Sequence, residues 1–124
     1  MKVFVFGNSD LDFDSFPLRI LPRLKKQLPK IDFEIKDPNE EWKVPEEIII
    51  IDTVAGINNP MVFESLESFS APPRVSMHDF DAYTNLKYLQ KLGKIKKIKI
   101  IGLPSMISKD VAIEFAIKIL SNSL

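Results

Sequence analysis

The sequence predicts a single α/β domain over residues 1–124, with three α/β/α layers around a mostly parallel central sheet of about five strands. Short β-branched and aromatic runs, at Lys2–Phe6, Ile48–Ile51 and Ile98–Gly102, are typical of strands. Leucine stripes at helical spacing alternate with these runs. Ile48–Ile51 is continuously apolar, which indicates a strand covered on both faces, as at the centre of a sheet between two helical layers.

The first half of the chain predicts a strand, a helix and a second strand. The helix is expected from Pro17 onward, because a proline in a first turn costs no hydrogen bond. Leucines follow it at helical spacing: Leu18, Leu21, Leu24 and Leu28. Pro22 either kinks this helix or marks its true start. Ile31–Lys36 alternates apolar and charged residues, which predicts a half-exposed strand near a sheet edge, and Asp37–Pro45 predicts a loop.

The second half predicts a weak strand at Met61–Phe69, a helix, a strand and a final helix. Ser76 begins a capping pattern before the first of these helices, which places His78 in its first turn. The apolar stripe of that helix consists of Ala82, Leu86, Leu89 and Leu92. It closes at Gly93, and Ser108 caps the final helix, whose apolar residues cover more than one face.

Composition excludes several classes of function. The chain has no cysteine, so disulfides, thiolate metal sites and cysteine nucleophiles are ruled out. Lysine plus arginine equals aspartate plus glutamate at 17 each, which provides no basic field for nucleic acid. No apolar stretch approaches the roughly 20 residues that span a bilayer, and the amino-terminal residues do not resemble a signal peptide. We therefore expect a soluble, cytoplasmic protein without membrane insertion, with a monomer as the favoured state.

Three polar side chains, Asp14, Asp52 and His78, follow predicted strands or open a predicted helix. In open α/β sheets, ligands bind outside the carboxyl ends of the strands, so all three side chains can reach the same rim of the sheet. We expect residues at such a rim to contribute little to the core. Two carboxylates and one imidazole suit a divalent metal such as nickel or zinc and leave coordination positions open. Each residue also has a structural interpretation, because an aspartate can cap an element and a lone histidine can be a satisfied polar residue.

Three motifs surround these residues in chain order. The first strand runs into Gly7-Asn8, and Asp14 comes six residues after the asparagine, with Arg19-Ile20 behind it. A central apolar strand ends in Asp52, with a glycine shortly after. Ser76-Met77-His78 precedes a leucine-striped helix and a strand that ends in Ile-Gly-Leu-Pro. Together the motifs resemble those of the hydrogenase maturation proteases, a family of endopeptidases, over almost the whole chain.

The resemblance implies a function and a site. Such proteins remove a C-terminal extension from the large subunit precursor of nickel-iron hydrogenase after nickel insertion. It implies that Asp14, Asp52 and His78 are both the catalytic residues and the metal contacts of an aspartic-type endopeptidase. The nickel is carried by the precursor, which is the partner, and cadmium or zinc is expected to replace it in crystals. The sequence lacks the Gly-x-Ser-x-Gly and His-Glu-x-x-His motifs of other hydrolases, in keeping with hydrolysis without a protein nucleophile.

Two segments depart from the family pattern. Ser15-Phe16-Pro17 stands where most members have glycines, so we expect the loop near Asp14 to follow a different backbone path. Asp37–Trp42 replaces a glycine- and threonine-containing loop thought to help bind substrate. Trp42 is either an aromatic contact for a peptide or a cover over the core, and we favour the core.

Two alternative functions stay open. A non-proteolytic relative would bind the same precursor as a nickel checkpoint, with the same three residues. A phosphoacceptor receiver domain would instead be phosphorylated at Asp52, but such a domain needs a lysine at the end of its last strand, where this chain has Leu103-Pro104. The receiver domain ranks well below the protease.

Overall fold

The computed structural model describes the backbone of residues 1–7, 12–36, 43–66 and 77–123, and their side chains except at 12–14 and 77–82. Eight elements follow one another: β1 (Lys2–Phe6), α1 (Asp12–Gln27), β2 (Asp32–Lys36), β3 (Glu47–Thr53), β4 (Met61–Phe63), α2 (Met77–Lys91), β5 (Lys97–Leu103) and α3 (Lys109–Ser123). In the described part of the chain, no helix is long and apolar enough to span a membrane.

The strands form one five-stranded sheet in the order β2-β1-β3-β5-β4. β2, β1, β3 and β5 are parallel, and β4 pairs antiparallel with β5. The predicted mostly parallel sheet is therefore confirmed, with β3 near its centre and β2 at its edge. The weak strand expected at Met61–Phe69 is present as β4 but ends at Phe63.

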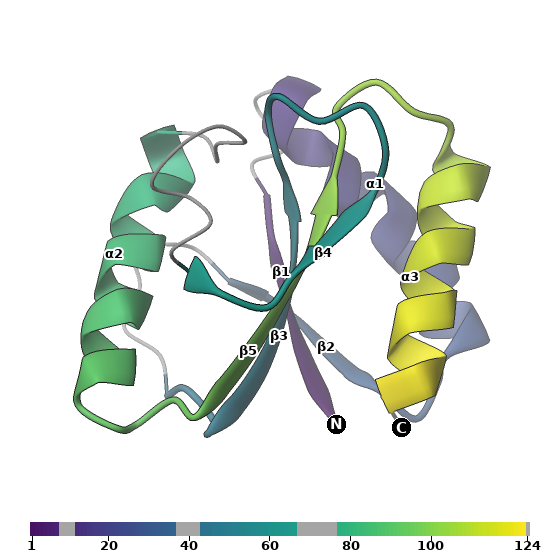
Figure 1. Cartoon of the computed structure of the whole chain (residues 1–124). Coiled ribbons are helices and arrows are strands. Elements are labelled where there is room, and N and C mark those ends of the chain that lie inside the picture. The colour runs from purple at the N-terminus through teal and green to yellow at the C-terminus, as the bar shows by residue number, and fades with distance from the viewer. Residues whose placement is uncertain (8–11, 37–42, 67–76, 124) are drawn as a thin grey trace.

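Helices cover both faces of the sheet, so the three layers are confirmed (Figure 1). α1 and α3 pack on one face, against a core that includes Val3, Val5 and Ile51. α2 packs on the other face, against a core that includes Phe4 and Ile50. The side chains of a strand alternate between faces, so one apolar run in β1 or β3 supplies both cores.

α1 differs from the prediction at its start. The helix begins at Asp12, so Asp14 lies in its first turn and not in a loop, and Pro17 and Pro22 both lie inside it. An interior proline costs about 3 kcal/mol. Phe16, Ile20 and Leu24 recur every fourth residue and are almost fully buried. Burial of such a stripe stabilises a helix more than its intrinsic propensity does, which explains why the prolines do not end it.

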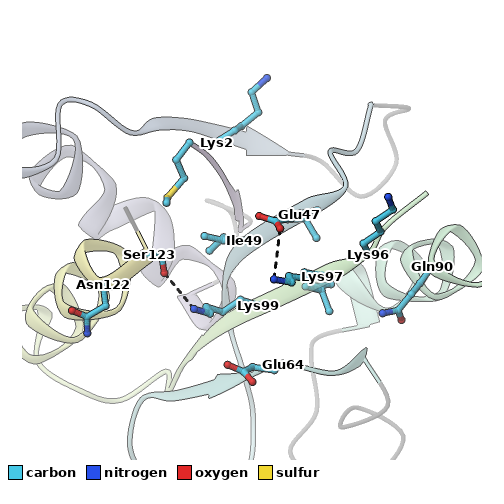
Figure 2. A pocket seen from close by; sticks show the side chains of 13 residues that line it. Lys2, Glu47, Ile49, Glu64, Gln90, Lys96, Lys97, Lys99, Asn122 and Ser123 are labelled. Carbon is cyan, nitrogen blue, oxygen red and sulfur yellow. Dashed lines mark hydrogen bonds and ion pairs between the residues drawn. The ribbon is translucent and has the colours of Figure 1, made fainter. Parts of the chain in front are cut away.

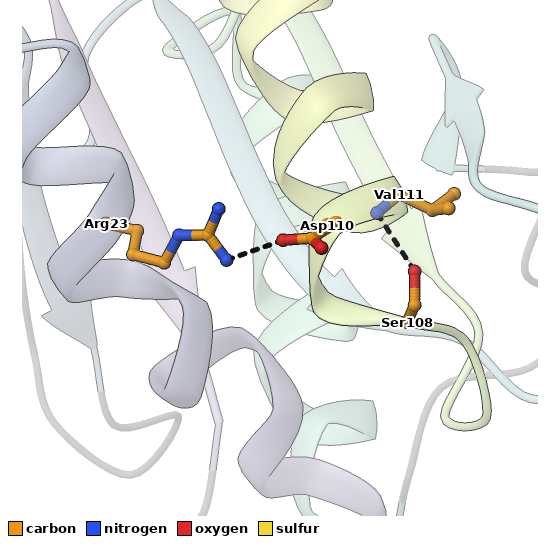
Figure 3. A network of polar contacts seen from close by, with 4 residues as sticks. All are labelled: Arg23, Ser108, Asp110 and Val111. Carbon is orange, nitrogen blue, oxygen red and sulfur yellow. Dashed lines mark hydrogen bonds and ion pairs between the residues drawn. The ribbon is translucent and has the colours of Figure 1, made fainter.

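The carboxyl-terminal cap of α2 and the amino-terminal cap of α3 agree with the sequence. Gly93 follows α2 with φ of 77°, and Lys94 donates its amide hydrogen to the Leu89 carbonyl at 3.0 Å, a Schellman cap. Ser108 Oγ accepts from the Val111 amide at 3.2 Å and caps α3, while Arg23 of α1 binds Asp110 of α3 at 2.8 Å (Figure 3). The cap at Gly93 closes the end of α2 that is opposite its first turn, where His78 lies.

Candidate active site

Asp52 lies at the carboxyl end of β3 and has no solvent-exposed surface. Its Oδ1 accepts a hydrogen bond from the Thr53 amide at 2.8 Å, and its Oδ2 accepts one from the Tyr83 hydroxyl at 3.0 Å. A carboxylate that is removed from water is stabilised by such donors. The orientation of Asp52 is therefore fixed by its own strand and by α2 together.

This burial corrects one expectation. We expected Asp52 to be a rim residue, whose replacement would disturb the core little. A fully buried carboxylate with two donors has a structural role as well, because removing it leaves both donors without their acceptor. Full burial also means that a metal held by another protein reaches Asp52 only after the atoms that cover it move.

The donor set of Asp52 remains compatible with a metal. Each oxygen of the Asp52 carboxylate accepts one of the two hydrogen bonds described above, and a carboxylate oxygen can accept more than one partner. Carboxylates that bind metals are commonly hydrogen-bonded in this way by surrounding groups. Asp52 therefore fits the role of an oxygen ligand to a divalent metal.

Tyr83 is a site residue that sequence reasoning missed. Its side chain is 3% exposed, and its ring meets the Phe6 ring edge-on, with centroids 5.5 Å apart and an interplanar angle of 61°. The available signal was its spacing of three residues before Leu86, which places it on the buried stripe of α2. A tyrosine on an apolar stripe needs a partner for its hydroxyl, and Asp52 is that partner.

Close packing surrounds the same strand end. Gly102 of β5 pairs with Asp52 across the sheet. A Cβ atom at Gly102 would lie 2.8 Å from Cε2 of Phe63 and 2.9 Å from Cγ2 of Val54. The absence of a side chain at Gly102 thus lets the Phe63 ring of β4 lie against the sheet beside Asp52.

Thr53 adds an unusual feature. It is fully buried, and its Oγ1 has no hydrogen-bond partner in the part of the chain that the structure describes. A buried, unsatisfied hydroxyl costs about 1–3 kcal/mol. Departures from complete hydrogen bonding are expected at functional sites, and this one directly follows Asp52.

Asp14 and His78 are placed by their backbones alone. Asp14 is in the first turn of α1, and His78, as predicted, is in the first turn of α2. Both helices begin on the side of the sheet where β1, β3 and β5 end (Figure 1). The side chains of Asp14 and His78 lie outside the described residues, as do Ser76 and the segment Asp37–Trp42. The convergence of Asp14, Asp52 and His78 on one metal thus stays a prediction.

Two cavities lie at opposite ends of the strands. The smaller, about 170 Å³, is formed by the segments after β3 and β5, from Val54 to Asn58 and from Pro104 to Met106. It begins two residues after Asp52 in the chain. Its position, next to the strand ends where ligands of α/β folds bind, makes it the cavity to associate with the candidate site.

The larger cavity, about 740 Å³, is at the amino ends of the strands, where Lys2, Glu47 and Lys97 begin β1, β3 and β5 (Figure 2). Its basic side chains are already engaged. Lys2 pairs with Glu34 at 3.0 Å and Lys97 with Glu47 at 3.8 Å. Further pairs are Lys96 with Glu46 at 3.5 Å and Lys99 with the Ser123 hydroxyl at 3.3 Å. Despite its size, this cavity offers no concentrated charge and lies at the opposite end of β3 from Asp52.

Comparison with solved structures finds proteins that share this fold. The chain is similar to the hydrogenase maturating endopeptidase HybD from E. coli, with a TM-score of 0.70 and 17% identity over 99% of this chain and 94% of that one. The solution structure of the endopeptidase HycI from Escherichia coli matches with a TM-score of 0.65 and 14% identity, over 98% of this chain and 90% of that one. A crystal structure of the hydrogenase 3 maturation protease matches with a TM-score of 0.64 and 15% identity, over 95% of this chain and 87% of that one.

The sequence itself matches no family model and no curated protein. At identities of 14% to 17%, the similarity to the solved structures establishes the architecture. It extends over nearly the full length of both chains, so it includes the strand that carries Asp52 and the helices that carry Asp14 and His78. The chain has the α/β fold of the hydrogenase maturation endopeptidases.

Proposed function

We propose that the chain is an endopeptidase of hydrogenase maturation that acts in the cytoplasm. Its substrate is the large subunit precursor of a nickel-iron hydrogenase, from which it removes the C-terminal extension after nickel insertion. One observation carries the proposal: a buried, doubly hydrogen-bonded carboxylate, Asp52, ends the central strand of a fold that solved hydrogenase maturation endopeptidases share. The order of the three sequence motifs supports the same function independently of the fold.

In this proposal, Asp14, Asp52 and His78 contact the nickel that the precursor already holds. Carboxylate oxygens and imidazole nitrogen suit nickel or zinc as ligands. Nickel supplies Lewis acidity, which can polarise a carbonyl group or lower the pKa of a water molecule. The residues of the chain orient the precursor around its metal, so an empty precursor lacks the contacts that position its scissile bond.

A receiver domain is not favoured. The flavodoxin-like order of such domains is 2-1-3-4-5, whereas here the edge strand β4 precedes β5 in the chain and is antiparallel to it. Asp52 is also completely buried, and each of its oxygens accepts a hydrogen bond. A small phosphodonor, like a metal held by the precursor, would therefore reach Asp52 only after the atoms that cover it move, so the strand order is the observation that disfavours a receiver domain.

The test uses a substitution that removes the charge of Asp52 and keeps its contacts. In Asp52→Asn, the amide oxygen can accept from the Thr53 amide while the amide nitrogen donates to the Tyr83 oxygen. We expect this variant to fold and to lose several powers of ten in the rate of precursor cleavage, which mass spectrometry measures. Asp110→Asn removes an equally negative carboxylate from the surface of α3 and should cleave normally.

Mass spectrometry of the chain incubated with the precursor also distinguishes an enzyme from a checkpoint protein. An endopeptidase shortens the nickel-loaded precursor, whereas a checkpoint protein forms a stable complex with it and leaves its mass unchanged. Stable binding without any loss of mass, with precursors from the same organism as the chain, would contradict the proposed function.

A further inference from the structure

Tyr83 reaches across from α2 to the end of β3. Its hydroxyl donates to Oδ2 of Asp52 at 3.0 Å, and both side chains are buried. The edge-on contact with Phe6 of β1 restrains the tyrosine ring at the same time. The hydroxyl is therefore held by two elements of the core, and its position does not depend on a flexible surface side chain.

The bond has a consequence for any metal that Asp52 contacts. With the Thr53 amide on Oδ1 and the Tyr83 hydroxyl on Oδ2, the orientation of the Asp52 carboxylate is held at both of its oxygens. Groups that orient a ligand in this way typically change metal affinity by about 10- to 100-fold when they are removed. A tyrosine that served only to fill the core would have no such effect.

We propose that Tyr83 is a positioning residue that holds Asp52 in the orientation required for metal contact. This inference rests on the proposed function to the extent that Asp52 contacts the metal. The hydroxyl acts through Asp52 and does not itself touch the substrate. It also connects α2, the helix that carries His78, to β3, the strand that carries Asp52. The relative position of two predicted metal contacts is therefore controlled in part by one hydrogen bond.

The variant that tests this inference is Tyr83→Phe, which deletes the hydroxyl and keeps the ring that packs on Phe6. Tyr88→Phe is the matched control, because Tyr88 is on the same helix and is 61% exposed. Circular dichroism confirms that each variant is folded. Isothermal titration with cadmium or nickel then measures the affinity of the isolated chain for the metal.

We expect Tyr83→Phe to bind metal about 10- to 100-fold more weakly than the unmodified chain, and Tyr88→Phe to bind equally well. The visible spectrum of bound cobalt at saturation provides a second readout. It should change in Tyr83→Phe, because a reoriented carboxylate alters the ligand field, whereas lost stability alone would leave the spectrum unchanged.

The outcomes separate the inference from the proposed function. If the unmodified chain binds metal and Tyr83→Phe matches it in affinity and cobalt spectrum, the positioning role is refuted and the metal site stands. If the unmodified chain binds no free metal but cleaves a loaded precursor, the endopeptidase stands and the cleavage rate of Tyr83→Phe decides the positioning role: a rate equal to that of the unmodified chain would refute it. If it neither binds metal nor cleaves, both proposals are refuted.

Discussion

Asp52 and Tyr83 form a buried hydrogen bond of 3.0 Å that joins the central strand β3 to helix α2. Neither side chain exposes more than 3% of its surface. The bond links the predicted metal ligand at the end of the sheet to the helix whose first turn contains His78. Stability and the geometry of the candidate site therefore depend on the same contact.

Removal of the Tyr83 hydroxyl should destabilise the folded chain. We expect Tyr83→Phe to lower the free energy of unfolding by about 1–3 kcal/mol, because a buried bond to a charged acceptor is lost and Oδ2 loses a donor. Urea denaturation measures the change. Tyr88→Phe, at an exposed position of the same helix, should change the free energy by less than about 0.5 kcal/mol. Equal effects of the two substitutions would show that the buried bond contributes nothing.

Gly102 should not tolerate a side chain. Gly102→Ala would bring a Cβ atom within 2.8 Å of the Phe63 ring and 2.9 Å of Val54, so we expect a loss of about 1–3 kcal/mol from overpacking. The clash should weaken the pairing of β4 with β5, which thermal denaturation and amide exchange can follow.

A double-mutant cycle isolates the cause of that loss. In a Phe63→Leu background the ring atoms that Gly102→Ala would meet are absent, so the second substitution should cost clearly less than in the unmodified chain. Strict additivity of the two substitutions would argue that Gly102 is required for a reason other than the position of the Phe63 ring.

Acid should weaken the edge of the sheet at Glu34. Hydrogen bonds from Lys2 and then Lys36, each at 3.0 Å, hold the pKa of Glu34 below its ordinary value of 4.5. A carboxylate with a lowered pKa in the folded state stabilises the fold above its unfolded pKa. That contribution should be lost as the pH falls from about 4.5 through the folded pKa.

The dependence of stability on pH, measured by urea denaturation from about pH 6 down to 3, checks this expectation. In Glu34→Gln the slope below about pH 4.5 should be shallower than in the unmodified chain, and added salt should reduce the difference because the ion pairs are partly exposed. Identical slopes for the two proteins would contradict a role for Glu34.

The sequence predicted the sheet well because β1, β3 and β5 are apolar enough to be recognised without their partners. Ile48–Ile51 required helices on both faces, and both helical layers are present. The predicted start of α1 was wrong, because Pro17 suggested a first turn and Pro22 a kink or the true start. The buried stripe that keeps the longer helix intact is effective only when it packs on the sheet. Helix propensity, which depends on local sequence, does not include that tertiary contact.

The sequence predicted three candidate ligands but not their surroundings. Asp52 was identified because it ends an apolar strand, but its complete burial and its bond to Tyr83 depend on where α2 packs. That packing relates residues 31 positions apart, and no local pattern gives their relative orientation. Thr53 was missed for the same reason, since an unsatisfied hydroxyl has no sequence signature.

The metal-gated cleavage of a hydrogenase precursor is the central claim, and its most direct test compares two forms of one substrate. The chain is incubated with the nickel-loaded and with the nickel-free large subunit precursor from the same organism, and the intact mass of each precursor is measured over time. We predict that the loaded precursor loses its C-terminal extension and that the empty precursor keeps its full mass. Equal shortening of both forms would refute the metal gate, and an unchanged mass in both would refute the endopeptidase.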